Sequence, residues 1–352
     1  MSTVFDTAPE SDASAPATAA RHPDVLWARH GVALLVVVVL AAFAPVVLPA
    51  SQQAVAVQVL IFAIMAVGWN LMSGFGGMFN FGNAAYFGVG AYADAYLLVE
   101  HGVSPWFGML AGAALAAALA ALIGFLTFRY RVSGAYFALA TFAFAEILRL
   151  VATNTDLVNR SIGYNVPLLQ DASWTQLQFP AGDHRYYWTG LALLALAMLV
   201  TIGYLRSRSG QYTVAIRDDE AAASSLGVNV LRYRLQTMAL SGAITAVAGA
   251  FYTQYFLFVN PDLAFSQNQS IQSILPAVIG GVGTIWGPLI GACIVGPLSN
   301  GTSTLLRHPP DWLMFLQGRS GLDVVIYAVL LILIVLLLPK GIYGTVRDRL
   351  RR

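Results

Sequence analysis

The stretch RSRSGQYTVAIRDDEAAASSLGVNVLRYR, residues 206–234, lies between two long apolar runs and carries five of the chain's arginines. It also carries a compact acidic run, Asp218, Asp219 and Glu220. A charged segment bounded by apolar runs of bilayer-crossing length is typical of a cytoplasmic loop in a membrane protein. The stretch therefore predicts a polytopic membrane fold with a structured loop on the cytoplasmic side.

The composition predicts the same fold class. Of the 352 residues, 58% are hydrophobic and only 10% are charged, and the mean hydropathy is +0.68. A chain with so little polar surface needs the bilayer as its main solvent, and we expect an all-α polytopic membrane protein. The net charge of +2 gives no basic surface for nucleic acid. The single cysteine, Cys293 in GACIVG, is expected to be a small buried residue outside any disulfide or metal cluster.

Ten apolar segments are candidates for helices that cross the hydrocarbon core, which is about 30 Å thick. They are residues 31–49, 53–72, 84–99, 105–128, 134–152, 187–205, 235–258, 268–284, 286–305 and 321–339. Residues 1–24 are rich in Ala, Ser, Thr and Pro and are expected to form a disordered cytoplasmic tail. Residues 25–345 form the predicted membrane domain, and 346–352 form a basic cytoplasmic C-terminus.

The distribution of positive charge predicts the orientation, because Lys and Arg gather in the cytoplasmic loops of membrane proteins. An even number of crossings places both termini, residues 129–131 and residues 206–234 on the cytoplasmic side. Residues 153–186 then form an outer, periplasmic loop. The segments between 268 and 305 form either two spans or one re-entrant unit, so the sequence allows ten or eight crossings.

Two glycine-rich segments interrupt the apolar pattern: GFGGMFNFGNAAYFGVGAY at 74–92 and IGGVGTIWGPLIGA at 279–292. Glycine in such segments indicates either close helix packing or a broken helix, and breaks are tolerated where freed backbone groups meet protein or a water-filled path. Both interpretations fit the sequence. On the second, the candidate path residues are Asn80, Asn83, Gly280, Gly281 and Gly283, together with Asp94.

Asp94 lies in the apolar stretch GAYADAYLL. A carboxylate near the bilayer centre costs about 2.5 to 3.5 kcal/mol on insertion scales, so such a residue has either a structural partner or a functional contact. The sequence leaves both open. Glu146 and Arg149 are spaced i, i+3 on a predicted helix and are expected to form an ion pair.

Seven segments in order resemble the LivM-type permease subunit of branched-chain amino acid ABC importers, within the wider group that includes ribose-type permeases. The likeness covers roughly residues 53–345. The segments are WNLMSGFGG at 69–77, GNAAYFGVGAY at 82–92, YFALATFAFAEILRL at 136–150, AIRDDEAAASSLGVN at 215–229, NPDLAFS at 260–266, GGVGTIWGPLIGA at 280–292 and LPKGIYG at 338–344. The first glycine-rich segment departs from the family's common pattern at Met78, Asn80 and Asn83, where Gln, Ser and His are usual.

The resemblance implies that 215–229 contains a cytoplasmic coupling helix that docks on an ATPase subunit. The residue types agree, because Asp218 and Asp219 favour a helix N-terminus, alanines form helix well, and Gly227 suits a left-handed helix end. The residues implied in coupling are Arg217, Asp218, Asp219, Glu220, Ala222, Ala223 and Gly227.

The resemblance also implies partners, because the chain has no ATPase motif of its own. A phosphate-binding loop requires GxxxxGK followed by Ser or Thr, whereas the single lysine, Lys340, is followed by Gly341. ATP and magnesium therefore belong to two partner ATPase subunits, and this chain is expected to be neither an enzyme nor a cofactor- or metal-binding protein. A second, LivH-type permease, a periplasmic substrate-binding protein and the lipid of a bacterial inner membrane complete the implied surroundings.

The predicted function is thus half of the translocation path of an ABC importer for branched-chain or related amino acids. The alternatives are a permease for urea or short amides and, in a different class, an ion-coupled secondary transporter that uses Asp94. An intramembrane enzyme is disfavoured because the histidines all fall in the tail or in predicted loops: His22, His30, His101, His184 and His308. The sequence names neither the solute nor the choice between a homo- and a heterodimeric permease pair.

Overall fold

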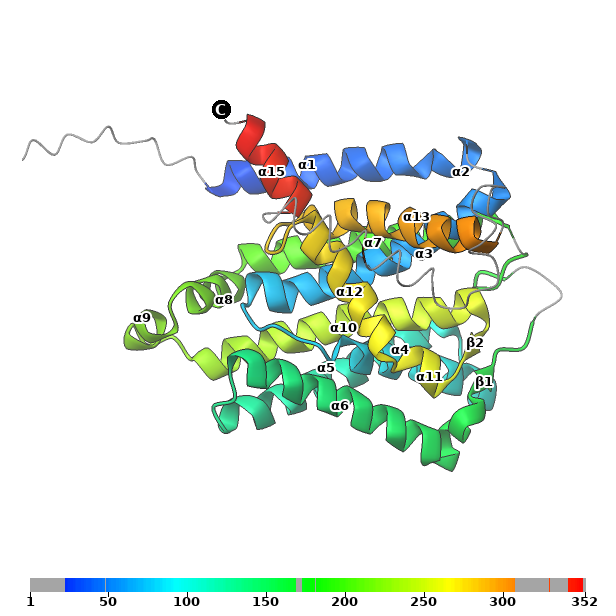
Figure 1. The fold of residues 1–352 in the computed structure, drawn as a ribbon, viewed down its shortest axis with the longest axis horizontal. Coiled ribbons are helices and arrows are strands. Elements are labelled where there is room, and N and C mark those ends of the chain that lie inside the picture. Colours follow the sequence, from blue (N-terminus) through cyan, green and yellow to red (C-terminus); the bar gives the residue numbers. More distant parts are fainter. Residues whose placement is uncertain are drawn as a thin grey trace, which may run out of the picture.

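The computed structural model describes residues 23–47, 49–168, 173–180, 182–307, 329 and 341–350. Within them the fold is helical, apart from one pair of two-residue strands (Figure 1). The helices are α1 (Pro23–Ala42), α2 (Ala44–Val47), α3 (Ala50–Trp69), η1 (Asn70–Phe75), α4 (Asn83–His101), α5 (Pro105–Arg129), α6 (Gly134–Asn154), η2 (Asp156–Val158), η3 (Arg160–Ile162), α7 (His184–Arg206), α8 (Arg208–Asp218), α9 (Glu220–Ser225), α10 (Val230–Phe256), α11 (Pro261–Ala264), α12 (Gln267–Gly280), α13 (Gly287–Arg307) and α15 (Gly341–Leu350). The strands are β1 (Tyr164–Asn165) and β2 (Phe258–Val259), which pair antiparallel.

The long helices run along a common direction, so the connections gather at two ends of the bundle (Figure 1). Helices α8 and α9 lie at the left end of that view, and the β1–β2 pair with α11 lies at the right end. Five helices are long and apolar enough to cross a membrane, judged on the described residues. They are Gln52–Phe75, Pro105–Arg129, Gly134–Asn154, His184–Arg206 and Val230–Phe256.

The core is built around α3 and α10. Helix α3 packs against α7, α10, α12 and α13, and α10 packs in turn against α4 and α5. Trp69 and Phe251, from these two central helices, are both fully buried. In contrast, α5 and α6 carry many exposed large apolar side chains, which is the surface that a lipid-facing helix needs.

The contact between α4 and α10 depends on glycine. A Cβ atom added at Gly90 would overlap the carbonyl of Ala246, and one added at Gly249 would overlap the carbonyl of Phe87. The two backbones therefore touch directly, as small residues allow in membrane helix pairs.

The structure revises several predictions from the sequence. Helix α12 has 14 residues, which at about 1.5 Å each is too short to cross about 30 Å of hydrocarbon, so 268–284 is not a full-length helical span. Cys293 is exposed, whereas the sequence predicted a buried residue, because it faces a cavity beside α13. The predicted span 321–339, Val329 apart, and the predicted tail up to residue 22 lie outside the described residues.

Candidate functional site

The first glycine-rich segment breaks the chain between α3 and α4. Helix α3 passes into the π-helix η1, all six residues of which are buried, and the Gly76 N–H donates to the Leu71 carbonyl at 3.1 Å in the i to i−5 pattern. Gly77 has φ +69°, a conformation that favours glycine, and no helix forms again until Asn83. The sequence predicted an interruption here but not the π-helix.

The second glycine-rich segment is a turn between α12 and α13. Gly281 and Gly283 have φ of +129° and +71°, and a Cβ atom on Gly280 would overlap the Gly287 carbonyl. The predicted path residues Gly280, Gly281 and Gly283 therefore lie together in one tight connection, because only glycine allows both the positive φ and the close approach.

Asn70, at the start of the π-helix, joins the two breaks. Its Nδ2 donates to the Thr284 carbonyl at 2.8 Å, and its Oδ1 accepts from the Gly283 N–H, also at 2.8 Å. Asn70 is buried, and its partners lie 213 and 214 residues further along the chain. Asn70 is not among the path residues predicted from the sequence, where its only signal is an amide inside an apolar run just before a glycine-rich segment.

Arg217, at the end of α8, reaches the same place from the charged loop. Its Nη1 donates to the Gly74 carbonyl at 3.1 Å, while Nε and Nη2 donate to Asp218 Oδ1 at 3.0 and 2.7 Å. A Cβ atom on Gly77 would lie 2.6 Å from Arg217 Cγ, so the arginine side chain lies against bare backbone. We call Asn70, Gly74, Gly77, Arg217 and Gly283 the π-helix junction.

The acidic run next to the junction forms the short helix α9. Asp219 separates α8 from α9 and caps α9, accepting from the Ala222 N–H at 2.9 Å. Glu220 forms an ion pair with Arg234 of α10 at 2.7 Å, and Gly227 follows the helix with φ +83°. The predictions of an aspartate cap and a left-handed glycine end are confirmed, with Asp219 as the cap and Asp218 paired instead to Arg217.

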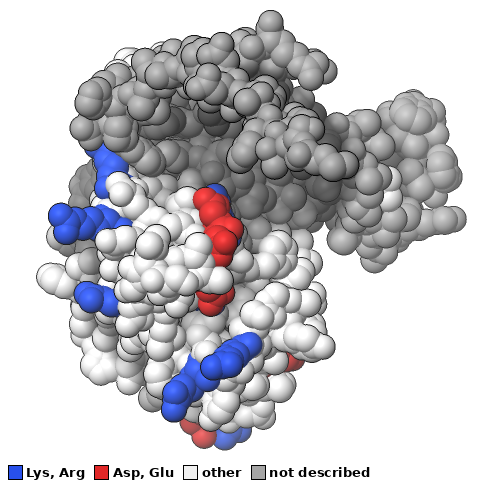
Figure 2. All heavy atoms as spheres, turned by 90° about the vertical axis from the view of Figure 1, so that its left-hand side faces the viewer, with Lys and Arg blue, Asp and Glu red and all other residues white. Residues whose placement is uncertain are grey.

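The outer surface of α9 combines charge with one apolar side chain. Ala222 is exposed, Ala223 packs inward, and Leu226 is 86% exposed just beyond the helix. Figure 2 looks onto this end of the molecule, where basic and acidic side chains are spread over the described surface. Leu226 therefore presents one exposed apolar side chain beside α9.

Asn80 and Asn83 are fully buried beside the first break. Asn80 Oδ1 accepts from the Gly82 N–H at 2.8 Å, and Asn83 Oδ1 accepts from Thr245 Oγ1 at 3.4 Å. Among the described residues, neither Nδ2 group has a hydrogen-bond partner. Since an unpaired buried amide is costly, each of these two donors requires a partner such as water or a polar ligand.

Asp94 lies elsewhere on α4 and is fully buried. Its Oδ2 accepts from Gln254 Nε2 of α10 at 2.5 Å, and a Cβ atom on Gly108 of α5 would overlap Oδ1. Gln254 is therefore the structural partner of Asp94, which could not be identified from the sequence. Glu146 and Arg149 form the predicted ion pair at 2.7 Å, and Arg149 also pairs with Asp262 at 2.6 Å.

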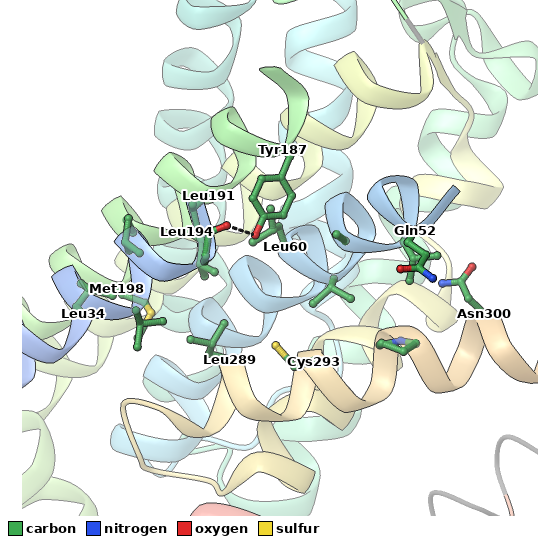
Figure 3. A pocket seen from close by; sticks show the side chains of 18 of the residues that line it. Leu34, Gln52, Leu60, Tyr187, Leu191, Leu194, Met198, Leu289, Cys293 and Asn300 are labelled. Carbon is green, nitrogen blue, oxygen red and sulfur yellow. Dashed lines mark hydrogen bonds between the residues drawn. The ribbon is translucent and has the colours of Figure 1, made fainter. Parts of the chain in front are cut away.

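A separate apolar cavity of about 900 Å³ opens between α1, α3, α7 and α13 (Figure 3). Leu34, Leu60, Leu191, Met198 and Leu289 are among its lining side chains, with Gln52 and Asn300 at one end. None of the predicted path residues lines it. Since none of its described lining residues is charged, these residues offer no ionic partner to the ammonium and carboxylate of an amino acid.

These features define a polytopic helical membrane protein with two interrupted helices and a charged loop joined to the interruptions, and comparison with known proteins gives the family. The family described as "Branched-chain amino acid transport system / permease component" matches residues 51–335. The high-affinity branched-chain amino acid permease protein LivM of Escherichia coli (strain K12) is 26% identical over 340 residues, covering 90% of this chain and 76% of the relative. LivH of Salmonella typhimurium is 28% identical over 296 residues, covering 80% and 91%.

The fructose import permease protein FrcC of Rhizobium meliloti is 32% identical over 175 residues, covering 48% of this chain and 47% of the relative. No solved structure matches the chain. The chain belongs to the family of branched-chain amino acid transport permease components. It is a permease subunit of an ABC transporter, in which the ATPase is a separate subunit and the permease is not itself catalytic.

Proposed function

We propose that this chain forms half of a translocation path for branched-chain or related amino acids, driven by ATP hydrolysis on two partner subunits. The proposed transporter also contains a second, LivH-type permease and a periplasmic binding protein. The relatives LivM and LivH carry the branched-chain amino acid assignment in their names, which supports this substrate class.

The observation that carries the proposal is helix α9. It is short, capped by Asp219, held by the Glu220–Arg234 ion pair and followed by the exposed Leu226. A helix fixed at its start and paired to the next membrane helix moves as a rigid piece, so it transmits a push better than a flexible loop. We therefore assign α9 and its flanks as the coupling helix, with Arg217, Asp218, Asp219, Glu220, Ala222, Ala223 and Gly227 as its working residues.

The arrangement of the loops supports a cytoplasmic position for α9. Helix α5 ends at Arg129 and the turn after it carries Arg131; this turn lies with α8, α9 and α15 at the same end of the bundle in Figure 1. Positive charge concentrated at one end marks the cytoplasmic side. On this proposal both termini are cytoplasmic, residues 153–186 face the periplasm, and the segments between 268 and 305 form one re-entrant unit from α12, the glycine-rich turn and α13.

The proposed path runs along the two breaks rather than through the apolar cavity. Asn80 and Asn83 supply amide donors that have no partner in the described part of the chain, and Gly280, Gly281 and Gly283 supply backbone free of side chains. Interrupted helices suit polar solutes, because their freed backbone groups can replace water. Asp94, already bonded to Gln254, is assigned to packing between α4 and α10.

Uptake of labelled leucine by the complete transporter, reconstituted in proteoliposomes and supplied with ATP, tests the proposal. An ATP-driven importer loses uptake in a vanadate-treated reconstituted system and keeps it when an uncoupler collapses the proton gradient. The reverse pattern would identify an ion-coupled transporter and overturn the proposal. Leucine, urea and a short amide offered in parallel distinguish the substrate classes.

The coupling assignment is tested separately with Gly227→Val. Gly227 has φ +83° and no atom of the described residues within 4 Å of an added Cβ, so the substitution strains the turn without a collision among them. We expect the complex to assemble and hydrolyse ATP while leucine uptake falls at least about tenfold, a loss that corresponds to about 1.4 kcal/mol. Full uptake by this variant would remove α9 from the coupling role.

A further inference from the structure

We infer that Arg217 is a positioning residue that carries the movement of α9 to the π-helix, and that Asn70 passes this movement on to the turn between α12 and α13. This inference rests on the proposed coupling role of α9 and adds the route from that helix to the two breaks. The route contains one side chain from the loop, one from η1 and the backbone of both glycine-rich segments.

The first step runs from α9 to Arg217. Only Asp219 separates the last residue of α8 from the first residue of α9, and its N–H remains bonded to the Ala215 carbonyl at 3.0 Å. A displacement of α9 therefore acts directly on the last turn of α8, where Arg217 lies. Asp218 holds the guanidinium by two hydrogen bonds, so the direction of the Arg217 head group is fixed.

The second step runs from Arg217 to the π-helix. Gly74 is the fifth residue of η1, and the carbonyls at a helix C-terminus lack partners within the helix. Arg217 Nη1 donates a hydrogen bond to the Gly74 carbonyl at 3.1 Å and brings a positive charge to the negative end of the helix. The aliphatic part of the same side chain lies against Gly77, so both the aliphatic part and the guanidinium of Arg217 contact the backbone of the break.

The third step runs from the π-helix to the second glycine-rich segment. Asn70 holds Gly283 and Thr284 by one accepted and one donated hydrogen bond, both at 2.8 Å and both partly buried. A Cβ atom on Gly74 would lie 2.5 Å from the Gly283 nitrogen, so η1 and the turn are also in direct backbone contact. A shift of η1 therefore displaces the turn that follows α12.

The π-helix is the element that can yield in this chain of contacts. Its i to i−5 hydrogen bonds are less favourable than those of an α-helix, and short π-helical turns occur mainly at functional positions. A π-helix can return to the α-helical pattern by moving one residue, which shifts everything after it. Arg217 holds one end of this element and Asn70 holds the other.

The experiment uses the complete transporter reconstituted in proteoliposomes with labelled leucine. Arg217→Ala is expected to keep ATP hydrolysis within about twofold and to lower leucine transported per ATP about tenfold, the effect of losing one charge-assisted hydrogen bond. Arg217→Lys keeps a charged donor but not the planar, forked guanidinium, so it should recover part of the leucine transported per ATP. The matched control is Arg208→Ala, an exposed arginine on the same helix, which should leave the ratio unchanged.

Asn70→Ala should reproduce the loss, and the double variant should lose no more than the larger single loss, because the two residues act in series. The inference is overturned if Arg217→Ala keeps the wild-type transport per ATP. It is equally overturned if hydrolysis and uptake fall in parallel at a constant ratio, since that result indicates impaired assembly or docking. Co-purification of the ATPase subunits with each variant records assembly directly.

A second readout does not depend on the solute. Hydrogen exchange at residues 281–286 should differ between the nucleotide-free and the ATP-bound complex, and this difference should vanish in Arg217→Ala and persist in Arg208→Ala. Persistence in both variants would contradict the inference. If wild-type complexes fail to move leucine but show this exchange pattern, the assigned solute is wrong and the junction still acts as described.

Discussion

Segments 74–92 and 279–292 both read as glycine-rich interruptions of an apolar run, but the two differ in what their glycines do. In the first, Gly74 and Gly77 belong to a break, whereas Gly90 lies inside α4 and allows it to touch α10. In the second, Gly281 and Gly283 have positive φ and form a turn. Close packing and chain interruption, which the sequence presented as alternatives, therefore both occur in the first segment. Its first half interrupts the chain, and its second half packs closely against α10.

The largest effect is expected at the packing half of the first segment. Gly90→Val places a branched side chain where even a Cβ atom would overlap the Ala246 carbonyl, and the backbone of α10 cannot move aside as a side chain could. We expect a loss of about 3 kcal/mol or more, seen as low yield and early thermal unfolding in detergent.

Its control is Gly203→Val on α7, where an added Cβ would have no atom within 4 Å from the part of the chain that the structure describes. This change should alter stability by no more than about 0.5 kcal/mol. Equal stability of the two variants would show that α4 and α10 are not in close backbone contact.

Whether an interaction could be predicted from the sequence depends on how far apart its two residues lie along the chain. The aspartate cap of α9, the left-handed Gly227 and the Glu146–Arg149 pair depend on neighbours within a few residues, and all were predicted. In contrast, the Asp94–Gln254 bond joins residues 160 positions apart, and nothing local in the sequence selects Gln254 as the partner.

The π-helix illustrates a second limit. Local propensity does not distinguish an α-helical from a π-helical turn in NLMSGF, since the bonds of Asn70 to the second glycine-rich segment belong to tertiary structure. Family resemblance identified the charged loop but not Arg217 as its link to Gly74. The family and the broad helical class were thus accessible from the sequence, while the contacts of the junction required coordinates.

An intermediate effect is expected in the turn of the second segment. Gly283→Val forces a β-branched residue to φ +71° and brings its Cβ within 3.2 Å of the Gly74 carbonyl. We expect a stability loss of about 1 to 2 kcal/mol and a larger proportional loss of leucine uptake. Val282→Ala, at the exposed neighbouring position, is the control and should change neither. Wild-type uptake in Gly283→Val would show that the turn geometry is not required for transport.

The smallest effect is expected for Asp94→Asn, on α4 two residues beyond the end of the first segment. Asp94→Asn keeps the size of the side chain and can still pair with Gln254, so thermal stability should change by less than about 1 kcal/mol and uptake should persist. Asp94→Leu leaves the Gln254 amide unpaired and should cost about 1 to 3 kcal/mol. A folded Asp94→Asn variant without uptake would instead give the carboxylate a direct role in transport.

The central claim, that α9 docks on a partner ATPase, is tested most directly by photo-crosslinking in native membranes. A photoreactive amino acid replaces Leu226, which is 86% exposed beside α9, and in a second protein it replaces Ile162, which is 69% exposed near the strand end of the bundle. The account predicts a crosslink from position 226 to an ATPase subunit, identified by mass spectrometry, and none from position 162. Absence of an ATPase product at 226, or equal capture from both positions, would contradict it.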